Sequence, residues 1–259
     1  MDPQGVRELL AQHPRCRFVS ITWIPTHTGT IQDVVAIGDV CETAGVPYHV
    51  DTCQAIGQLP IDVSQLKCDY LSATGRKFLR GPRGTGFLYI SDRALERGDQ
   101  PLHIDMRGAE WTSPDSFTPA ATARRFEEWE FAYALVLGLG ESARYAIGAG
   151  VEECGRRAML LAASVRERLA ALPGAKVLDR GRDLSAIVTV SFAGHDGGEL
   201  ARLLKERHIN TVSSLRWCGL LDFAERGVTT AVRISPHYYN TAEEIDTLIE
   251  ALGEIVTPA

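Results

Sequence analysis

One lysine stands out among the residues that could do chemistry. The chain has 27 basic residues, but only four of them are lysines, at positions 67, 77, 176 and 205. A lysine amine can lose its proton and attack a carbonyl carbon, whereas a guanidinium in practice does neither. Lys77 lies in a glycine-rich segment just after the β-prone run DYLSA. It is therefore the first candidate for a nucleophile.

A carboxylate and an arginine accompany this lysine. Asp51 directly follows the β-prone run YHV, and Arg233 lies inside the β-prone run AVRIS. Ligands of open α/β sheets bind beyond the carboxyl ends of the strands, so we expect Asp51 and Lys77 at one rim. Each residue alone has a simpler interpretation. Asp51 could be a helix N-cap, Lys77 a solvated surface charge and Arg233 part of an internal ion pair.

Together the three residues supply what pyridoxal 5'-phosphate (PLP) requires. The cofactor needs a lysine amine for its aldehyde and a carboxylate that keeps its pyridine nitrogen protonated. An arginine fork can hold the carboxylate of an amino-acid substrate. The glycines at positions 75, 81, 84 and 86 suit a backbone that turns tightly and approaches a ligand closely. They match neither the G-x-G-x-x-G fingerprint nor a P-loop, so nucleotide binding is not expected.

The first half of the chain alternates between strand and helix patterns. Strands are predicted at 17–24, 47–50, 69–73 and 86–90, and helical segments at 5–13, 32–43 and 63–66. This order predicts an α/β fold with a mainly parallel sheet. Residues 101 to 124 lack periodicity and are rich in Pro, Ser and Thr, which indicates a long surface or active-site loop.

The second half predicts a different architecture. Helical periodicity runs from 131 to 172 with a break near 148–150, and shorter strands and helices follow. We therefore predict a partial large domain over residues 1–130, bridging helices over 131–172 and a small α+β domain over 173–259.

Composition excludes several classes of partner. The formal charge of -6 gives no electrostatic footprint for nucleic acid or anionic lipid. No apolar run reaches the ~18 residues of a membrane span, and the start lacks the regions of a signal peptide. We expect a cytoplasmic protein. No C-x-x-C pair is present, so neither a metal site nor a redox motif is predicted among the six cysteines, Cys16, Cys41, Cys53, Cys68, Cys154 and Cys218.

At the candidate residues the sequence resembles the class V aminotransferase superfamily, the fold-type I PLP enzymes that include cysteine desulfurases. The matching motifs are the Asp-x-x-Gln of residues 51–54, the SATGRK of 72–77 and the C-terminal VRISPHYYNTAEEIDTL. The resemblance implies a role for each matching residue. Lys77 would bind the PLP aldehyde, Asp51 would pair with the pyridine nitrogen and Gln54 would contact the phenolic oxygen, with Arg233 on the substrate carboxylate. Ser72 or Thr74 would contact the phosphate. Arg76 departs from the family pattern, but as a permanent cation it could also reach the phosphate.

Three departures from the desulfurase pattern separate the chain from that branch. Arg76 replaces the usual histidine before the lysine, and Glu128-Trp129-Glu130 follow Arg-Phe-Glu in place of Gly-Thr. Cys218 lacks the neighbours of the desulfurase nucleophile, and its bulky apolar neighbours Trp217 and Leu220 favour a structural thiol. The phrases ATGRKFLRGPRGTGFLY and ARRFEEWE resemble instead the hercynylcysteine sulfoxide lyases of the ergothioneine pathway. Those enzymes cleave a carbon-sulfur bond without a cysteine nucleophile.

Several functions fit this resemblance. The leading hypothesis is a PLP-dependent carbon-sulfur β-lyase that acts on a cysteine-derived amino acid. A cysteine desulfurase, selenocysteine lyase, transaminase or epimerase would share its first steps. Compared with usual members the chain is expected to be N-terminally truncated, without the loop that grips the phosphate. A homodimer or a complementing N-terminal chain would then complete the site, and a non-catalytic truncated homologue is the remaining alternative.

Overall fold

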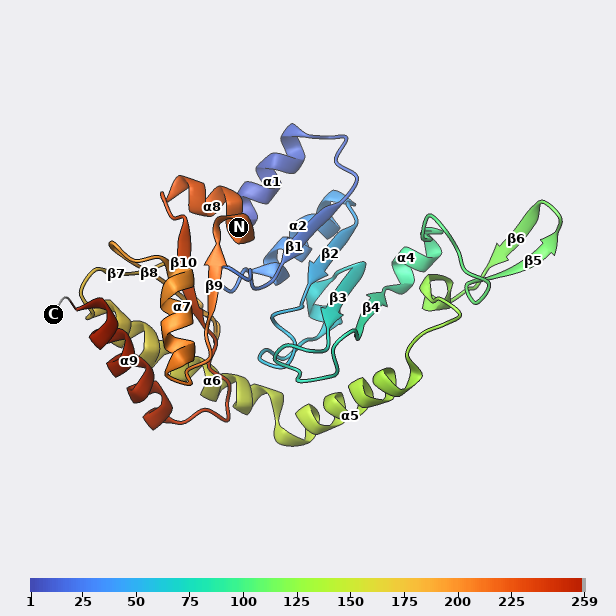
Figure 1. The fold of residues 1–259 in the computed structure, drawn as a ribbon. Coiled ribbons are helices and arrows are strands. Elements are labelled where there is room, and N and C mark those ends of the chain that lie inside the picture. Colours follow the sequence, from blue (N-terminus) through green and yellow to red (C-terminus); the bar gives the residue numbers. More distant parts are fainter. Residues whose placement is uncertain (258–259) are drawn as a thin grey trace. The chain divides into compact units, whose positions relative to one another are not determined.

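The computed structural model describes residues 1–257 and falls into two compact units (Figure 1). The first unit comprises Met1–Trp23, Asp33–Ile56 and Ile61–Ala146. The second comprises Ile24–Gln32, Gly57–Pro60 and Ile147–Ala259. Each unit has its own sheet.

The sheet of the first unit is mainly parallel, as the sequence predicts. Its strands are β1 (Val19–Thr22), β2 (Tyr48–Asp51), β3 (Tyr70–Thr74) and β4 (Gly86–Ile90), in that spatial order. Strands β1, β2 and β3 run parallel, and β4 pairs with β3 in the antiparallel sense. The helices α2 (Val34–Ala44) and α3 (Val63–Leu66) stand between successive parallel strands in the chain, which is the crossover order that parallel strands require.

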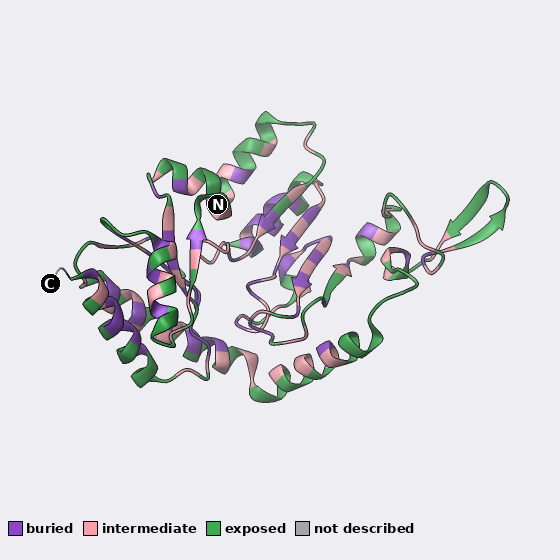
Figure 2. Ribbon diagram, viewed as in Figure 1, coloured by how far each residue is buried: buried purple, intermediate pink, exposed green. Residues whose placement is uncertain are grey.

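The two faces of this sheet differ in character because successive side chains of a strand point to opposite faces. One face carries apolar residues that form a core with α2, shown as buried in Figure 2; its members include Ile21, Val50, Leu71, Val34 and Ile37. On the other face His49 bridges two strands. Its Nδ1 lies 2.8 Å from Ser20 Oγ, and its Nε2 lies 2.9 Å from Ser72 Oγ.

The remaining elements of the first unit include one that the sequence hides. They are α1 (Pro3–Gln12), α4 (Asp92–Glu96), the strands β5 (Ala109–Ser113) and β6 (Ser116–Pro119), the 3-10 helix η1 (Ala123–Phe126) and α5 (Tyr133–Ala149). Strands β5 and β6 form a hairpin within the segment expected to be a loop. Nearly all of its residues are exposed, so no alternation of apolar and polar residues marks these strands in the sequence.

The second unit is an α+β assembly around an antiparallel sheet of order β7-β8-β10-β9. Its strands are β7 (Ala175–Val177), β8 (Val188–Phe192), β9 (Val212–Leu215) and β10 (Thr230–Ile234). Its helices are α6 (Val151–Ala170), α7 (Gly197–Glu206), η2 (Arg216–Gly219), α8 (Leu220–Glu225) and α9 (Ala242–Val256). The expected helix break falls at Gly150, whose φ of 83° separates α5 from α6.

The boundary between the units differs from the sequence-based division. The long helical region does not form a unit of its own, because α5 lies mostly in the first unit and α6 in the second. Two short loops that follow β1 and β2 also belong to the second unit. Gly29 N donates to Asp179 Oδ1 at 2.9 Å, and Ala186 N donates to Gln58 Oε1 at 3.1 Å. Such long-range bonds leave no local pattern in the sequence.

Candidate active site

Lys77 lies in a closed loop that begins where β3 ends. Gly75 N donates to Thr85 O at 2.9 Å, and Gly81 N donates to Gly75 O at 2.7 Å. Inside this closure Arg80 N donates to Lys77 O at 2.8 Å. The loop therefore holds Lys77 just beyond the carboxyl end of β3, as the sequence predicts.

The glycines of this loop are required by close packing. A Cβ on Gly75 would lie 2.6 Å from both Leu139 Cδ1 and Thr85 Oγ1, and one on Gly81 would lie 3.0 Å from Leu139 Cδ1. Leu139 comes from α5 and is buried at 8% exposure. A Cβ on Gly86 would lie 2.3 Å from Ala73 O, so the start of β4 also needs glycine. The lysine loop is thus fitted against the side chain of Leu139.

Asp51 ends β2 and is tied to its surroundings through both carboxylate oxygens. Its Oδ1 accepts from Cys53 N at 2.8 Å, and its Oδ2 accepts from Thr22 Oγ1 at 3.5 Å. It lies beside Ser72 in the parallel register of β2 and β3. Asp51 is the last residue of a strand and not the N-cap of a helix, so the simpler interpretation of this residue is wrong.

The next residue locks the ends of β2 and β3 together. Thr52 is fully buried, and its N and Oγ1 both donate to Ser72 O at 2.8 Å. The sequence did not single out this threonine. These two hydrogen bonds fix the turn after β2. Asp51 ends β2 just before this turn, and Lys77 follows the end of the neighbouring strand β3.

The charges of Asp51 and Lys77 both affect the pKa of the Cys53 thiol. Burial, with added effects of a hydrogen bond to Asp51 and of its charge, raises the pKa of Cys53 to about 11. The positive charge of Lys77 acts in the opposite direction on the same thiol. A carboxylate, a thiol and an amine therefore gather at this rim, and the sequence pointed to two of the three.

The other predicted cofactor contacts differ in their exposure and in their hydrogen bonds. Gln54 is buried at 6% exposure, and Arg76 is exposed. The Ser72 hydroxyl is bonded to His49 in the body of the sheet, whereas Thr74 is the last residue of β3. Thr74 Oγ1 lies 3.5 Å from Thr85 O, a longer contact than the 2.9 Å between Ser72 Oγ and His49 Nε2.

Arg80 adds a strained residue to the lysine loop. Its φ of 58° is left-handed, which is uncommon for a residue other than glycine. Its guanidinium lies 5.0 Å from the ring centroid of Tyr145 on α5, within cation-π range. Strain of this kind gathers at functional loops, although a sequence pattern does not reveal it.

Arg233 lies in β10 of the second unit. Its Nη1 donates to Thr26 Oγ1 at 2.7 Å and to Thr26 O at 3.3 Å. Thr26 belongs to the same unit, in the loop after β1. This threonine was missed because 207 residues separate the pair.

Cys218 departs from the sequence-based expectation. It is half-buried in η2, and the two apolar residues expected to bury it are themselves exposed. Trp217 is 76% exposed and Leu220 is 56% exposed. The argument that bulky apolar neighbours make Cys218 a structural thiol is therefore wrong, because their side chains lie largely in solvent.

The segment that contains Cys218 is held by His27. A Cβ on Gly219 would lie 2.3 Å from the His27 ring, and the ring meets buried Phe223 edge-on at 5.5 Å. His27 Nε2 lies 3.6 Å from Asp222 Oδ2. Burial lowers the pKa of His27, and Asp222 opposes this shift. The glycine after Cys218 is required by this contact.

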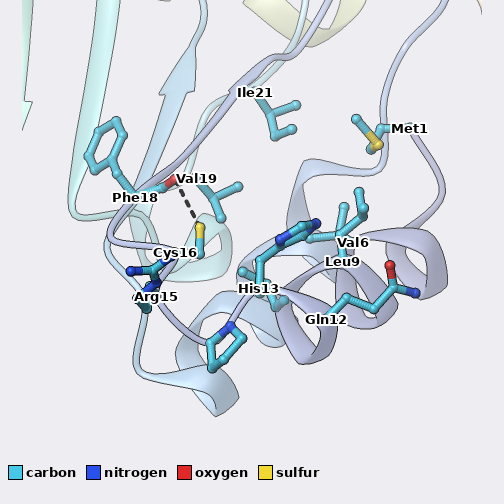
Figure 3. A pocket seen from close by; sticks show the side chains of 12 residues that line it. Met1, Val6, Leu9, Gln12, His13, Arg15, Cys16, Phe18, Val19 and Ile21 are labelled. Carbon is cyan, nitrogen blue, oxygen red and sulfur yellow. Dashed lines mark hydrogen bonds between the residues drawn. The ribbon is translucent and has the colours of Figure 1, made fainter.

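A groove of about 710 Å³ in the first unit lies apart from these residues. Its lining is mostly apolar and comes from α1, β1 and the turn between them, including Val6, Leu9, Phe18, Val19 and Ile21 (Figure 3). Neither Asp51 nor Lys77 lines it.

Among the described residues no helix is long and apolar enough to cross a membrane.

The parallel sheet with its lysine loop, together with the antiparallel second sheet, defines the fold of the fold-type I PLP enzymes. Residues 1–248 match the family model of class V aminotransferases, and the chain belongs to this family. PLP is the cofactor of the family. The resemblance to class V aminotransferases inferred from the sequence is confirmed.

The curated relatives include cysteine desulfurases. A probable cysteine desulfurase of Methanothermobacter thermautotrophicus is 31% identical over 98% of this chain and 64% of its own length. The cysteine desulfurase IscS of Pectobacterium atrosepticum is 29% identical over 92% of this chain and 57% of its own length. The chain thus spans less than two thirds of the length of these relatives.

Solved structures show the same fold. The cysteine desulfurase CsdA of Escherichia coli has a TM-score of 0.86 at 26% identity, over 97% of this chain and 63% of that one. The cystine C-S lyase C-DES, in complex with its reaction product cysteine persulfide, has a TM-score of 0.81 at 26% identity. That match covers 97% of this chain and 65% of the lyase.

Proposed function

We propose that the chain carries the cofactor lysine and the substrate-carboxylate arginine of a PLP-dependent enzyme. In this proposal it cleaves the carbon-sulfur bond of a cysteine-derived amino acid. The observation that carries the proposal is the rim of the first sheet, where Asp51 and Lys77 follow the ends of adjacent parallel strands and both act on Cys53. An amine and a carboxylate at one rim form the pair that PLP requires.

The residues at the rim fit the cofactor. Lys77 would hold its aldehyde and Asp51 its pyridine nitrogen, with Gln54 at the phenolic oxygen. Thr74 and the exposed Arg76 would contact the phosphate, Thr74 in preference to Ser72. Asp51 is suited to this role because Thr22 and Cys53 N already orient its carboxylate. When bound, the cofactor supplies an electron sink for bond breaking at the α-carbon of the substrate.

The chain's own groups would perform the proton transfer and the substrate binding. The Lys77 amine would take the α-proton and deliver a proton to the departing group, because it is the amine at the rim. Arg233 would bind the substrate carboxylate, with its guanidinium oriented by Thr26. These steps are shared with transaminases, epimerases and selenocysteine lyases, so they do not by themselves define the reaction.

Different observations support two fates of the sulfur atom. A β-lyase is supported by the likeness to C-DES and by Arg76 in place of the desulfurase histidine. A desulfurase is supported by the curated relatives and by Cys218, whose flanking side chains leave the segment open to solvent. In the desulfurase reaction a thiolate attacks the substrate sulfur and carries it as a persulfide, whereas the lyase expels the sulfur group without such a nucleophile.

The Cys218→Ser variant separates these two reactions. A β-lyase should keep its rate of pyruvate release from a cysteine-type substrate within about twofold, because Lys77 and the cofactor suffice for elimination. A desulfurase instead leaves the carbon skeleton as alanine, because the thiolate removes the sulfur and the β-carbon is protonated. Alanine release by the wild type that is lost in the variant, together with a persulfide on wild-type Cys218, would assign the protein to the desulfurases. Cys154→Ser is the matched control, since Cys154 is also half-buried but lies in α6.

The site assignment is tested by borohydride reduction in the presence of PLP. Reduction should fix the cofactor to Lys77, and peptide mass spectrometry should locate it there. Lys67 provides an internal control, because it ends α3 and pairs with Asp39 and Glu42 at 2.9 and 2.7 Å. Label on Lys67 alone would refute the assignment. A protein that binds no PLP would instead support the non-catalytic alternative.

The partners and the compartment remain proposals. Enzymes of this family act on small amino acids, and we propose a homodimer or a complementing N-terminal chain as the protein partner. A cytoplasmic location is supported by the six cysteines, all of which are free. Light scattering of the purified chain, alone and with PLP, would test the dimer.

A further inference from the structure

We propose that the second unit contains a binding site for a free α-amino acid with a hydrocarbon side chain. The site is a pocket of about 440 Å³, and small-molecule sites have volumes of about 300–1,000 Å³. Three segments form it: the loop between α7 and β9, the end of β10 and the first half of α9. Its lining includes Arg207, His208, Thr211, Ile234, Glu244 and Leu248, all within the second unit.

This pocket is distinct from the proposed substrate site. Successive side chains of a strand point to opposite faces of the sheet. Ile234 is buried and lines the pocket, whereas its neighbour Arg233 does not line it and donates to Thr26. An amino acid in this pocket would therefore leave Arg233 accessible to a substrate carboxylate.

The loop after α7 contains a residue in an uncommon backbone conformation. Ile209 N donates to Leu204 O at 2.9 Å, and His208 N donates to Lys205 O at 3.0 Å. These two bonds are those of a Schellman helix end, whose left-handed position is usually glycine. Here that position is His208, with a φ of 63°. His208 lines the pocket.

The same loop contains a second unfavourable feature. Thr211 Oγ1 is buried, and it has no hydrogen-bond partner among the described residues. Such a hydroxyl destabilises a folded protein, and the violation of local rules is expected at functional sites. Thr211 is only half-buried as a residue and lines the pocket, so a change of its χ1 rotamer would turn the hydroxyl toward a ligand.

Opposite charges in the lining fit a zwitterion. Arg207 Nη1 donates to Glu254 Oε2 at 2.5 Å, but the arginine side chain is 42% exposed, and such surface pairs contribute little. The guanidinium can therefore turn to a ligand carboxylate. Glu244 Oε2 accepts from Asn240 Nδ2 and from Thr241 N, both at 2.9 Å. These bonds hold the pKa of Glu244 below its ordinary value and leave Oε1 for an ammonium group.

The apolar part of the lining fits a hydrocarbon side chain. Ile234 and Leu248 are buried and come from β10 and α9. Each functional group of the amino acid then has its own contact. Arg207 and Thr211 bind the carboxylate, Glu244 binds the ammonium group, and the apolar wall takes the side chain.

Isothermal titration calorimetry of the purified chain tests the site, with L-leucine as the probe. L-leucine should bind, whereas 4-methylpentanoate, which lacks the ammonium group, should bind at least about tenfold more weakly. Arg207→Gln and Glu244→Gln should each raise the Kd for L-leucine about tenfold, because each removes one charged contact. Glutamine can still complete the capping box of α9, so Glu244→Gln should fold. Arg202→Gln, on α7 but outside the pocket, is the matched control and should leave the Kd unchanged.

Thr211→Val gives a result that a purely structural residue would not give. It replaces an unsatisfied hydroxyl with a methyl group, so the melting temperature should rise. The Kd for L-leucine should nevertheless rise about fivefold, because a ligand hydrogen bond is lost. Thr189→Val is the control, since Thr189 Oγ1 is also buried without a partner among the described residues but lies in β8 outside the pocket. That variant should have a higher melting temperature and an unchanged Kd.

Arg233→Ala distinguishes this pocket from the proposed substrate site, and it should bind L-leucine as the wild type does. The inference is wrong if the wild type does not bind L-leucine at millimolar concentrations, or if 4-methylpentanoate binds equally well. It is also wrong if Arg207→Gln and Glu244→Gln bind L-leucine as the wild type does, or if Arg233→Ala abolishes binding. The proposed function is tested separately, through the attachment of PLP to Lys77.

Discussion

The contact between Gly75 and Leu139 makes a quantitative prediction about the lysine loop. Gly75→Ala would place a Cβ 2.6 Å from Leu139 Cδ1, and such overpacking typically costs about 1–3 kcal/mol. Leu139→Ala removes a side chain that is only 8% exposed, which should cost about 2–5 kcal/mol. In the double variant the first clash is relieved, because the leucine methyl is gone. The double variant should therefore lose less free energy of unfolding than the two single variants lose together, by about 1 kcal/mol or more.

Urea unfolding followed by circular dichroism would measure these free energies in wild type, both single variants and the double variant. Leu137→Ala is the control on the same helix, since Leu137 is 73% exposed and should change the free energy of unfolding by less than about 0.5 kcal/mol. Thr85 Oγ1 also lies 2.6 Å from the added Cβ, so the relief should be partial. Strict additivity of the two costs would show that Leu139 does not support the loop.

Further predictions concern the rim and the second unit. Asp51→Asn should preserve folding, because an amide oxygen can still accept from Cys53 N, but should lower turnover by about 10²–10³-fold through loss of the charge partner; circular dichroism and kinetics together would check this. Thr52→Val should lower the free energy of unfolding by about 0.5–1.5 kcal/mol, because the Ser72 carbonyl loses one of its two donors and keeps Thr52 N; urea titration would measure it, and an unchanged midpoint would contradict it. Burial holds the pKa of His27 below 6.5, while Asp222 raises it and Arg226 lowers it. The neutral form is thus favoured in the folded state, so the stability from His27 should be complete above about pH 6.5 and be lost as the pH falls through its folded pKa. His27→Gln should remove this part of the pH dependence, and titration of unfolding in wild type and variant would detect an error in the sign.

Much of the fold could be predicted because its signals are local. Strands such as β8 and β10 are largely apolar runs, and the N-cap of α9 is Thr241, which forms a capping box with Glu244. The hairpin of β5 and β6 could not be predicted in this way, since its exposed residues need no alternation. Local patterning thus reports an element only where that element buries one face.

The charged residues of the candidate site could be predicted from the sequence, but the side chains that orient them could not. Lys77 and Asp51 follow β-prone runs, so their common rim follows from the rule for parallel strands. The side chains that orient them come from distant positions, as with Thr22 on Asp51 and Leu139 beneath the loop. The surroundings of Cys218 were misjudged, because adjacency in the sequence does not say whether Trp217 points into the protein or into solvent.

His49 imposes a direction on the polar face of the first sheet. Burial lowers the pKa of His49, against the opposing effect of Asp51, which favours the neutral ring. A neutral imidazole donates from one nitrogen and accepts at the other, so one of the Ser20 and Ser72 hydroxyls must donate a hydrogen bond to the ring while the other accepts one from it. The two hydroxyl rotors are thereby coupled, and the chain of bonds has only two polarities across three strands. Nitrogen chemical shifts that identify the tautomer of His49 would report the orientation of a hydroxyl on each neighbouring strand.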